Sequence, residues 1–291
     1  MSVPSSASPA AASSAPAPPL LLSPVATAAV VARLRAAGCV FAEDEAALLL
    51  SAASTVAGLD ALVERRAGGL PLEQVLGWAE FRGLRMAVDP GVFVPRRRTE
   101  YLVDRAVLLA RPGAVVVDLC CGSGALGAAL AASLDGIELH AADIDPAAVR
   151  CARRNVGPVG GHVHEGDLYD PLPAALRGRV DVLLANVPYV PTEEIGLLPP
   201  EARIHEARVA LDGGADGLDV LRRVSAGARG WLAPGGCLIF ETSEHQTPAA
   251  VETVARDGLV PHVAHAEELY ATVVVATALA GPGAIGRDPV V

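Results

Sequence analysis

The residues Asn186-Val187-Pro188-Tyr189 follow an apolar stretch, 181–185, that has the composition of a buried strand. An asparagine side-chain oxygen and the backbone carbonyl of the next residue can together accept the two N–H bonds of a planar NH₂ group, and a tyrosine ring can stack on that group. Such a clamp would orient a nitrogen nucleophile for group transfer, in which positioning supplies much of the rate enhancement. A turn that carries a surface aromatic is the alternative interpretation, because Asn and Pro also favour turns.

A glycine-rich segment, DLCCGSGALG (118–127), follows an earlier apolar run. Gly122, Gly124 and Gly127 have the G-x-G-x-x-G spacing, which lets a ligand approach the backbone and the start of the next helix. A glycine turn for close packing of a strand and a helix would give the same spacing. The segment therefore predicts a nucleotide site only in combination with other residues.

Carboxylates stand where the next two apolar runs end. Asp143 lies nineteen residues after Gly124 and can accept hydrogen bonds from both hydroxyls of a ribose. Asp167 could accept from the exocyclic amine of an adenine, with Leu168 against the ring, although an aspartate that caps the following turn would look the same. These positions predict a cofactor that contains adenosine.

Asp118 helps to choose between two such cofactors, a dinucleotide and S-adenosyl-L-methionine. A carboxylate directly before the glycines would repel a pyrophosphate, but it could hold a cationic methionine group directly or through water. The sequence therefore favours S-adenosyl-L-methionine. Pairing with a nearby arginine is the alternative role for Asp118.

The elements that must position these residues are short, mostly apolar runs with helical stretches between most of them. The runs cover residues 114–120, 137–143, 162–167, 181–186 and 236–242. Such a pattern is typical of a parallel sheet with helices on both faces, in which ligands bind beyond the carboxyl ends of the strands. We predict an α/β, doubly wound, class I (Rossmann-like) methyltransferase domain over residues 99–278, in which Asn186 lies beside the acid of the second strand.

The remainder of the chain divides by composition. Residues 1–24 are rich in Pro, Ser and Ala and predict a disordered lead-in. Apolar residues at helical spacing predict a small helical domain over 25–74. Alternating residues that turn at 89–91 (Asp-Pro-Gly) predict a β-hairpin linker over 75–98, and a flexible tail is expected over 279–291.

Charge and residue inventory exclude several functions. The 291 residues carry a net charge of −10 and no lysine, which argues against a general electrostatic grip on nucleic acid and excludes Schiff-base and P-loop lysines. The five cysteines lack CxxC spacing, and His162 and His164 alternate along a strand, so no metal or disulfide framework is expected. The chain shows neither a run of roughly 20 apolar residues nor a signal-peptide pattern, which predicts a cytoplasmic protein with no membrane contact.

Beyond these patterns, the chain from about residue 25 to 276 resembles the HemK/PrmC family of protein-(glutamine-N5) methyltransferases. The segments that carry the resemblance are GGLPLEQVLGWAEFRGL, FVPRRRTEYLV, DLCCGSGALG, AADIDPAAVRCARRN, GDLYDPL, NVPYVP, EARIHEARVALDGGADGLDVLRR and LAPGGCLIFETSEHQ. The resemblance implies methyl transfer from S-adenosyl-L-methionine to the side-chain amide nitrogen of a glutamine in a protein. It also implies a peptide chain release factor as the substrate, docked by the helical domain.

The resemblance assigns roles to individual residues. Asp143 would bind the ribose hydroxyls, Asp167 and Leu168 would contact the adenine, and Asn186 to Tyr189 would hold the acceptor glutamine, with Asn186 between it and the cofactor. The loop that would hold the methionine and ribose parts of the cofactor consists of Cys120, Cys121, Gly122, Ser123 and Gly124. Polar positions of the family that are expected to be supports are matched by Glu206, Glu241 and Gln246.

The chain also departs from the family pattern. Val187 replaces the first proline of Asn-Pro-Pro-Tyr, Cys120 stands where a glycine is common, and Ala207 replaces a usual proline. Arg97 and Arg98 replace the Pro and Glu of a typical PRPETE segment. A valine keeps the backbone carbonyl that the clamp needs, so we expect activity to survive, while the altered pocket wall and the added arginines could change the acceptor protein.

Three other functions remain open at this point. Adenine-N6 methylation of nucleic acid uses similar loops for a flipped base, although neither a basic cleft nor a sequence-reading segment is evident here. An NAD-dependent oxidoreductase is disfavoured by Asp118 and by the lack of an acid/base group beside the glycine loop. A catalytically impaired S-adenosylmethionine-binding scaffold that docks release factors would account for Val187, Ala207 and Cys120.

Overall fold

The computed structural model describes residues 23–279, which divide into two compact units at Gly68 and Gly69. The predicted lead-in and tail lie, apart from their inner ends, outside the described residues. Over the described part of the chain, no helix is both long and apolar enough to cross a membrane.

The first unit is helical and consists of α1 (Pro24–Ala36), α2 (Ala42–Ala52) and α3 (Val56–Ala67). Ser23 and Thr55 cap α1 and α3 by accepting hydrogen bonds from the backbone N–H groups three positions further on, which satisfies donors that a helix start leaves free. A buried ion pair joins Arg66 Nε to Glu45 Oε2 at 2.6 Å. Helices thus lie where the apolar spacing indicated them, while the extent of this domain over 25–74 and its docking role stay predictions.

The second unit begins with α4 (Leu72–Leu76) and the hairpin of β1 (Trp78–Phe81) and β2 (Leu84–Ala87). The hairpin is present, but its strands turn at Arg82 and Gly83, whose φ values are 50° and 71°. Two adjacent positive φ values are the geometry that matches the twist of a two-residue hairpin. The expected turn at 89–91 also forms, since Val92 N donates to Asp89 O at 3.1 Å, but it is not the turn of the hairpin. The Asp-Pro-Gly sequence instead lies in the segment that leaves the hairpin.

A seven-stranded sheet forms the centre of this unit, in the order β5-β4-β3-β6-β7-β9-β8. Its strands are β3 (Val115–Leu119), β4 (Glu138–Asp143), β5 (His162–Glu165), β6 (Val180–Ala185), β7 (Leu232–Thr242), β8 (Leu259–Ala266) and β9 (Ala271–Ala278). The first five are parallel and correspond to the predicted runs, whereas β9 pairs antiparallel with both β7 and β8 and was not expected. The doubly wound α/β fold class is thus confirmed.

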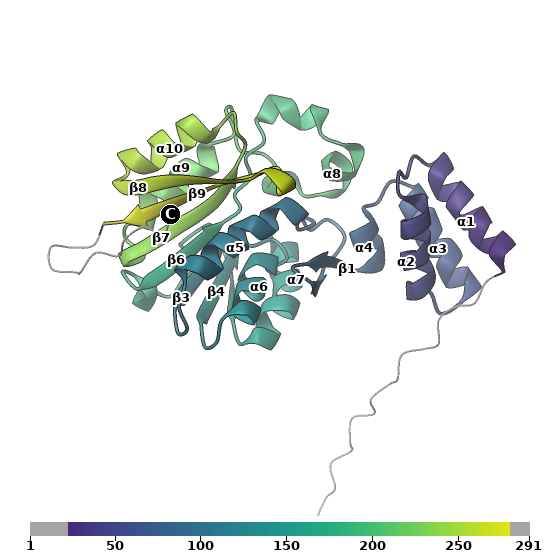
Figure 1. Ribbon diagram of the computed structural model, residues 1–291, viewed down its shortest axis with the longest axis horizontal. Coiled ribbons are helices and arrows are strands. Elements are labelled where there is room, and N and C mark those ends of the chain that lie inside the picture. Colours follow the sequence, from purple (N-terminus) through teal and green to yellow (C-terminus); the bar gives the residue numbers. More distant parts are fainter. Residues whose placement is uncertain (1–22, 280–291) are drawn as a thin grey trace, which may run out of the picture. The chain divides into compact units, whose positions relative to one another are not determined.

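Helices cover both faces of the sheet (Figure 1). The longer ones are α5 (Glu100–Leu109), α6 (Ala125–Ser133), α7 (Pro146–Val156), α9 (Asp219–Ala228) and α10 (Thr247–Arg256). Successive strand residues alternate between two apolar clusters: Val116 packs with residues of α5, α6 and α7, while Val115 and Val117 pack with residues of α9 and α10. The sheet is therefore buried on both sides, as continuous apolar strands require.

Short elements connect this framework. They are α8 (Pro200–His205) and the 3₁₀ turns η1 (Arg97–Thr99), η2 (Gly157–Val159), η3 (Ala174–Leu176), η4 (Thr192–Leu197), η5 (Arg208–Ala210) and η6 (Glu267–Leu269). One expected adjacency is wrong, because β3 lies between β4 and β6 and so separates the strand that ends at Asp143 from the one that ends before Asn186. The two residues still lie at the same edge of the sheet, since all three strands are parallel.

Candidate active site

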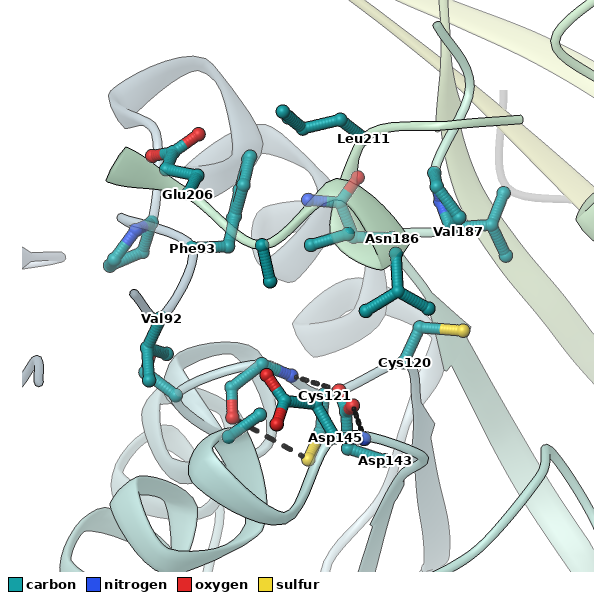
Figure 2. Close-up of a pocket in the computed structure, with 18 of the residues that line it drawn as sticks. Val92, Phe93, Cys120, Cys121, Asp143, Asp145, Asn186, Val187, Glu206 and Leu211 are labelled. Atoms are coloured by element: carbon teal, nitrogen blue, oxygen red, sulfur yellow. Dashed lines mark hydrogen bonds between the residues drawn. The ribbon is translucent and has the colours of Figure 1, made fainter. Parts of the chain in front are cut away.

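A cavity of about 460 Å³ opens at the carboxyl ends of β3, β4, β5 and β6. The loop after β3 and the end of β4 line one part of it, and the loop after β6 lines another. Several residues of the segments 92–98 and 198–211 also line it, and Figure 2 shows Phe93, Glu206 and Leu211 beside the acceptor loop. The cavity therefore brings together the cofactor segment and the acceptor segment that the sequence analysis singled out.

The cofactor loop is held by Asp143. Its Oδ2 accepts a hydrogen bond from Gly122 N at 2.8 Å, and its Oδ1 accepts one from Asp145 N at 2.9 Å (Figure 2). Burial raises the pKa of the Asp143 carboxyl above its usual value. Asp143 thus links the loop after β3 to the end of β4 while it lines the cavity, where a ribose would be bound.

The glycines of the loop have different roles. A Cβ on Gly124 would lie 2.7 Å from Val156, and one on Gly127 would lie 2.9 Å from Leu139, so these two glycines permit close packing of α6 on its neighbours. A Cβ on Gly122 would meet nothing within 4 Å, and Gly122 lines the cavity. Gly124 and Gly127 are therefore explained by close packing of the helix, whereas Gly122 leaves space beside the backbone at the cavity.

Cys120 has a φ of 52°, a left-handed conformation that glycine adopts at low cost. It lines the cavity together with Cys121 and Ser123. Burial, with the nearby carboxyls of Asp143 and Asp118, raises the pKa of the Cys120 thiol well above its usual value, so the thiol stays protonated. The departure from glycine at this position therefore costs backbone strain without introducing a charged nucleophile.

Asp118 lies behind the cofactor loop, 1% exposed, and is not among the residues that line the cavity. Its Oδ2 accepts a hydrogen bond from Gly127 N at 2.9 Å, whereas Oδ1 is buried without a partner among the described residues. Burial raises the pKa of Asp118 to about 7. Its expected contact with the methionine end of the cofactor stays a prediction, and no arginine pairs with it among the described residues.

Asp167 and Leu168 both line the cavity near the end of β5. The Asp167 carboxylate binds Arg223 Nη2 of α9. Leu168 has a φ of 48°, which is uncommon for a branched side chain. The expected adenine contacts of both residues stay predictions.

Two hydrogen-bond acceptors on residues of the acceptor loop have no partner among the described residues. Asn186 Oδ1 is buried and has no partner in the described part of the chain. The Val187 carbonyl likewise takes part in none of the hydrogen bonds found among residues 23–279. The Val187 side chain is 3% exposed and packs in the core cluster beneath the loop, while the residue also lines the cavity. Two acceptors on successive residues are what a planar NH₂ group requires.

Residues 211–217 and Gln246 support this loop from behind. Val190 N donates to Leu211 O at 3.0 Å, and Gly213 N donates to Val190 O at 2.9 Å. Gln246 Nε2 donates to Tyr189 O at 2.8 Å and to the Asp216 carbonyl at 3.0 Å. The ALDGGADGLD segment is thus a backbone support for the acceptor loop, and Gln246 has the supporting position expected of it.

Tyr189 belongs to a cluster that the sequence analysis did not foresee. Its hydroxyl donates to Glu241 Oε1 at 3.1 Å and accepts a hydrogen bond from Arg98 Nη2. Burial and the Glu241 carboxylate raise the pKa of Tyr189 to about 12, so the hydroxyl keeps its proton and can donate it. Spacing gave no signal for this contact, because the three residues lie on η1, after β6 and at the end of β7.

Glu206 holds residues 92–96 in place. Its carboxylate accepts from Val94 N at 3.1 Å and from Arg96 Nη2 at 2.7 Å, and its side chain is fully buried. Ala207 N donates to Gly91 O at 3.1 Å beside this pair. Burial raises the pKa of Glu206 above its usual value, although Arg96 opposes that shift. Glu206 is therefore a buried support rather than a surface residue.

The arginines that line the cavity are all neutralised. Arg96 pairs with Glu206, Arg98 with Glu241 and Arg223 with Asp167. These are the three lining cations within the described residues, and none was assigned to the site from sequence. The wall therefore suits a neutral acceptor better than an anionic one.

Comparison with known proteins identifies the class and then the family. Residues 84–218 match the methyltransferase small domain model. A solved methyltransferase from Pyrococcus furiosus has the same fold, with a TM-score of 0.52 and 16% identity over 68% of this chain and 90% of that one. The solved structure shares the fold, and the matched family model assigns this fold to the class of the methyltransferases.

Sequence relatives narrow this class. The release factor glutamine methyltransferase of Gloeobacter violaceus is 43% identical over 194 residues, which cover 65% of this chain and 67% of the relative. The 4-amino-L-phenylalanine/4-methylamino-L-phenylalanine methyltransferase of Streptomyces pristinaespiralis is 37% identical over 63% of this chain and 65% of the relative. The chain belongs to the release factor glutamine methyltransferase family.

Proposed function

We propose that this enzyme transfers a methyl group from S-adenosyl-L-methionine to the side-chain nitrogen (N5) of a glutamine in a peptide chain release factor. The family membership supports the reaction class. The observation that carries the proposal is a pair of acceptors without partners among the described residues, Asn186 Oδ1 and the Val187 carbonyl, on two residues that line the cavity. A primary amide has two N–H donors in one plane, which this pair can satisfy.

The residues of the chain account for the catalysis. S-adenosyl-L-methionine supplies a methyl group activated by its sulfonium. Asn186 and the Val187 carbonyl accept the two amide N–H bonds, which fixes the plane of the nitrogen and stabilises positive charge as it develops there. The methylated amide then loses its proton readily, so no dedicated base is needed. Pro188 restricts the backbone of the loop, and Tyr189 offers a ring on which the planar amide can stack.

The open cofactor loop fits this cofactor. Gly122 exposes its backbone to the cavity, and Asp143 presents a carboxylate beside it. We infer that Asp143 binds the ribose hydroxyls, that Asp167 and Leu168 contact the adenine, and that residues 120–124 surround the methionine part.

The neutral wall favours a glutamine side chain over a free amino acid. The Streptomyces pristinaespiralis relative is named for two phenylalanine derivatives, and any free amino acid brings an α-carboxylate. Such a carboxylate would be a second one in the cavity, beside that of the methionine part of the cofactor, and Arg96, Arg98 and Arg223 already bind carboxylates. A glutamine within a polypeptide has no α-carboxylate to place. Nucleic acid is disfavoured for a related reason, since the chain has a net charge of −10.

The helical unit provides a separate surface for the protein substrate. Val40 and Phe41, between α1 and α2, are 83% and 68% exposed. Exposed apolar side chains of this size mark interaction surfaces when they lie together. We infer that this unit docks the release factor, and that the enzyme works in the cytoplasm, where translation terminates.

The test incubates the purified full chain with methyl-labelled S-adenosyl-L-methionine and a release factor, and maps the label by mass spectrometry. A release factor whose acceptor glutamine is changed to alanine is the control. We expect one methyl group on the glutamine and none on the control. Label on free 4-amino-L-phenylalanine or on adenine in DNA, with none on glutamine, would reject the proposal. Binding of the cofactor without any methyl transfer would instead favour a catalytically impaired protein that binds S-adenosyl-L-methionine and docks release factors.

A further inference from the structure

Arg98 makes two hydrogen bonds that converge on the acceptor loop. Its Nε donates to Glu241 Oε1 at 2.8 Å, and its Nη2 donates to the Tyr189 hydroxyl. The same Glu241 oxygen accepts from the Tyr189 hydroxyl at 3.1 Å. Three side chains, from η1, the loop after β6 and the end of β7, therefore form a closed triangle of hydrogen bonds, and one of them, Tyr189, belongs to the acceptor loop and lines the cavity.

Glu241 makes this triangle more than a surface ion pair. Its side chain is 4% exposed, and its second oxygen, Oε2, is buried without a partner in the described part of the chain. A buried carboxylate needs a counter-charge, and a partner lost from a buried pair costs more than one lost from an exposed pair. Arg98 supplies that charge, and its side chain is 46% exposed at the cavity wall.

We propose that Arg98 is a positioning residue for methyl transfer, which fixes the ring of Tyr189 through its hydroxyl and so sets the face on which the acceptor amide stacks. This inference rests on the proposed function. Arg98 does not contact the reacting atoms; it acts through Tyr189, with Glu241 as the anchor. The planar guanidinium suits this task because its donors have a fixed geometry, whereas a lysine offers one compact charge on a flexible stem.

The neighbouring Arg97 provides a matched control. Arg97 is exposed, lies on the same short turn and does not line the cavity, and its side chain makes no hydrogen bond or ion pair found among residues 23–279. Arg97→Ala therefore removes the same charge from the same segment without touching the triangle. Any effect of net charge on substrate docking would appear in both variants, but an effect on Tyr189 would appear only in Arg98→Ala.

The experiment is a double-mutant cycle in the release factor assay, with Arg98→Ala, Tyr189→Phe and the combination. We expect each single change to lower kcat about tenfold, since small misplacements of a bound group can cost up to roughly 10²-fold. The combination should be no more than about twofold slower than either single variant, because both remove the same interaction. Arg98→Lys should recover part of kcat, and Arg97→Ala should match the wild type.

The outcomes separate the two claims. Unchanged kcat in Arg98→Ala, or losses that multiply to about 10²-fold in the combination, would overturn the positioning role while leaving the methylation proposal intact. A rise in KM alone would also overturn it, because that change reports docking rather than orientation. No methylation by the wild type would instead defeat the proposed function. If Arg98→Ala does not fold, Arg98→Lys takes its place in the cycle, together with Tyr189→Phe and the combination of these two changes. Thermal unfolding checks that each variant is folded.

Discussion

Gly217→Ala should damage catalysis from a position behind the acceptor loop. Gly217 has a φ of 77°, and a Cβ built on it would overlap the Tyr189 carbonyl oxygen and Gln246 Nε2, far inside the 3.0 Å that real Cβ contacts respect. Gln246 is buried and bridges Tyr189 and Asp216, so neither neighbour can move independently. The added methyl must therefore displace the acceptor loop.

The magnitude has two parts. A non-glycine residue in this left-handed region costs about 1–2 kcal/mol of folding free energy. To relieve the overlap, the Tyr189 carbonyl must retreat by roughly 1 Å, and a displacement of that size at a reacting group can lower the rate about 10²-fold. Gly113→Ala is the matched control, because Gly113 also has a φ of 77° but a Cβ there meets nothing within 4 Å.

Urea unfolding should show a loss of about 1–2 kcal/mol in Gly113→Ala from backbone strain alone, and a larger loss in Gly217→Ala, where the overlap adds to the same strain. Single-turnover methyl transfer should fall about 10²-fold in Gly217→Ala and stay near wild type in Gly113→Ala. Calorimetry should give an unchanged Kd for S-adenosyl-L-methionine in both. If Gly217→Ala loses only stability and keeps its rate, the support that we assign to this segment does not exist.

Three further changes test other parts of the site. Asn186→Ala should lower kcat by roughly 10²-fold through loss of a transition-state hydrogen bond, with cofactor affinity unchanged; an unaltered kcat in the methylation assay would refute its role. Asp143→Ala should weaken cofactor binding by calorimetry at least about tenfold, because it releases Gly122 N as well as the ribose contact, and an unchanged Kd would mean that the ribose lies elsewhere. Asp118 should make stability depend on pH: its pKa is about 7 in the folded chain and 3.8 as a free group, so the folded state keeps a proton that the unfolded state releases. Stability should therefore fall as pH rises through this interval and level off above it, and Asp118→Asn should remove that fall in unfolding measured at pH 5 and pH 8.

Much of the fold and both halves of the site were predictable because their signals are local. Runs of apolar residues bounded by Gly, Asp and Asn marked the five parallel strands, and the same boundaries placed Asp143 and Asn186 at one edge of the sheet. The antiparallel strands β8 and β9 escaped notice because their residues mix apolar, histidine and threonine positions. The hairpin turn was misplaced because Asp-Pro-Gly is a stronger sequence signal than Arg82-Gly83, although the latter has the required φ values.

The contacts that hold the acceptor loop could not be predicted, since each joins residues far apart in the chain. Arg98 and Tyr189 are separated by 91 positions, and Gln246 and Tyr189 by 57. Their side chains meet only because β6 and β7 are adjacent in the sheet and η1 follows the hairpin segment that lines the same cavity. The type of a residue does not indicate which distant side chain it will contact, so Glu241 and Gln246 could be named as supports only through family resemblance.

These contacts also explain how the loop tolerates valine at its second position. Proline would restrict the backbone by itself, whereas Val187 leaves φ free to vary and must be held by its surroundings. The Val187 side chain is buried in the core. The N–H and the carbonyl of Val190 both form hydrogen bonds with the segment 211–217. Gln246 and Arg98 then fix Tyr189 at its carbonyl and at its hydroxyl. Contacts from neighbouring residues thus supply the rigidity that a proline ring would give, and the Val187 carbonyl stays available as an acceptor.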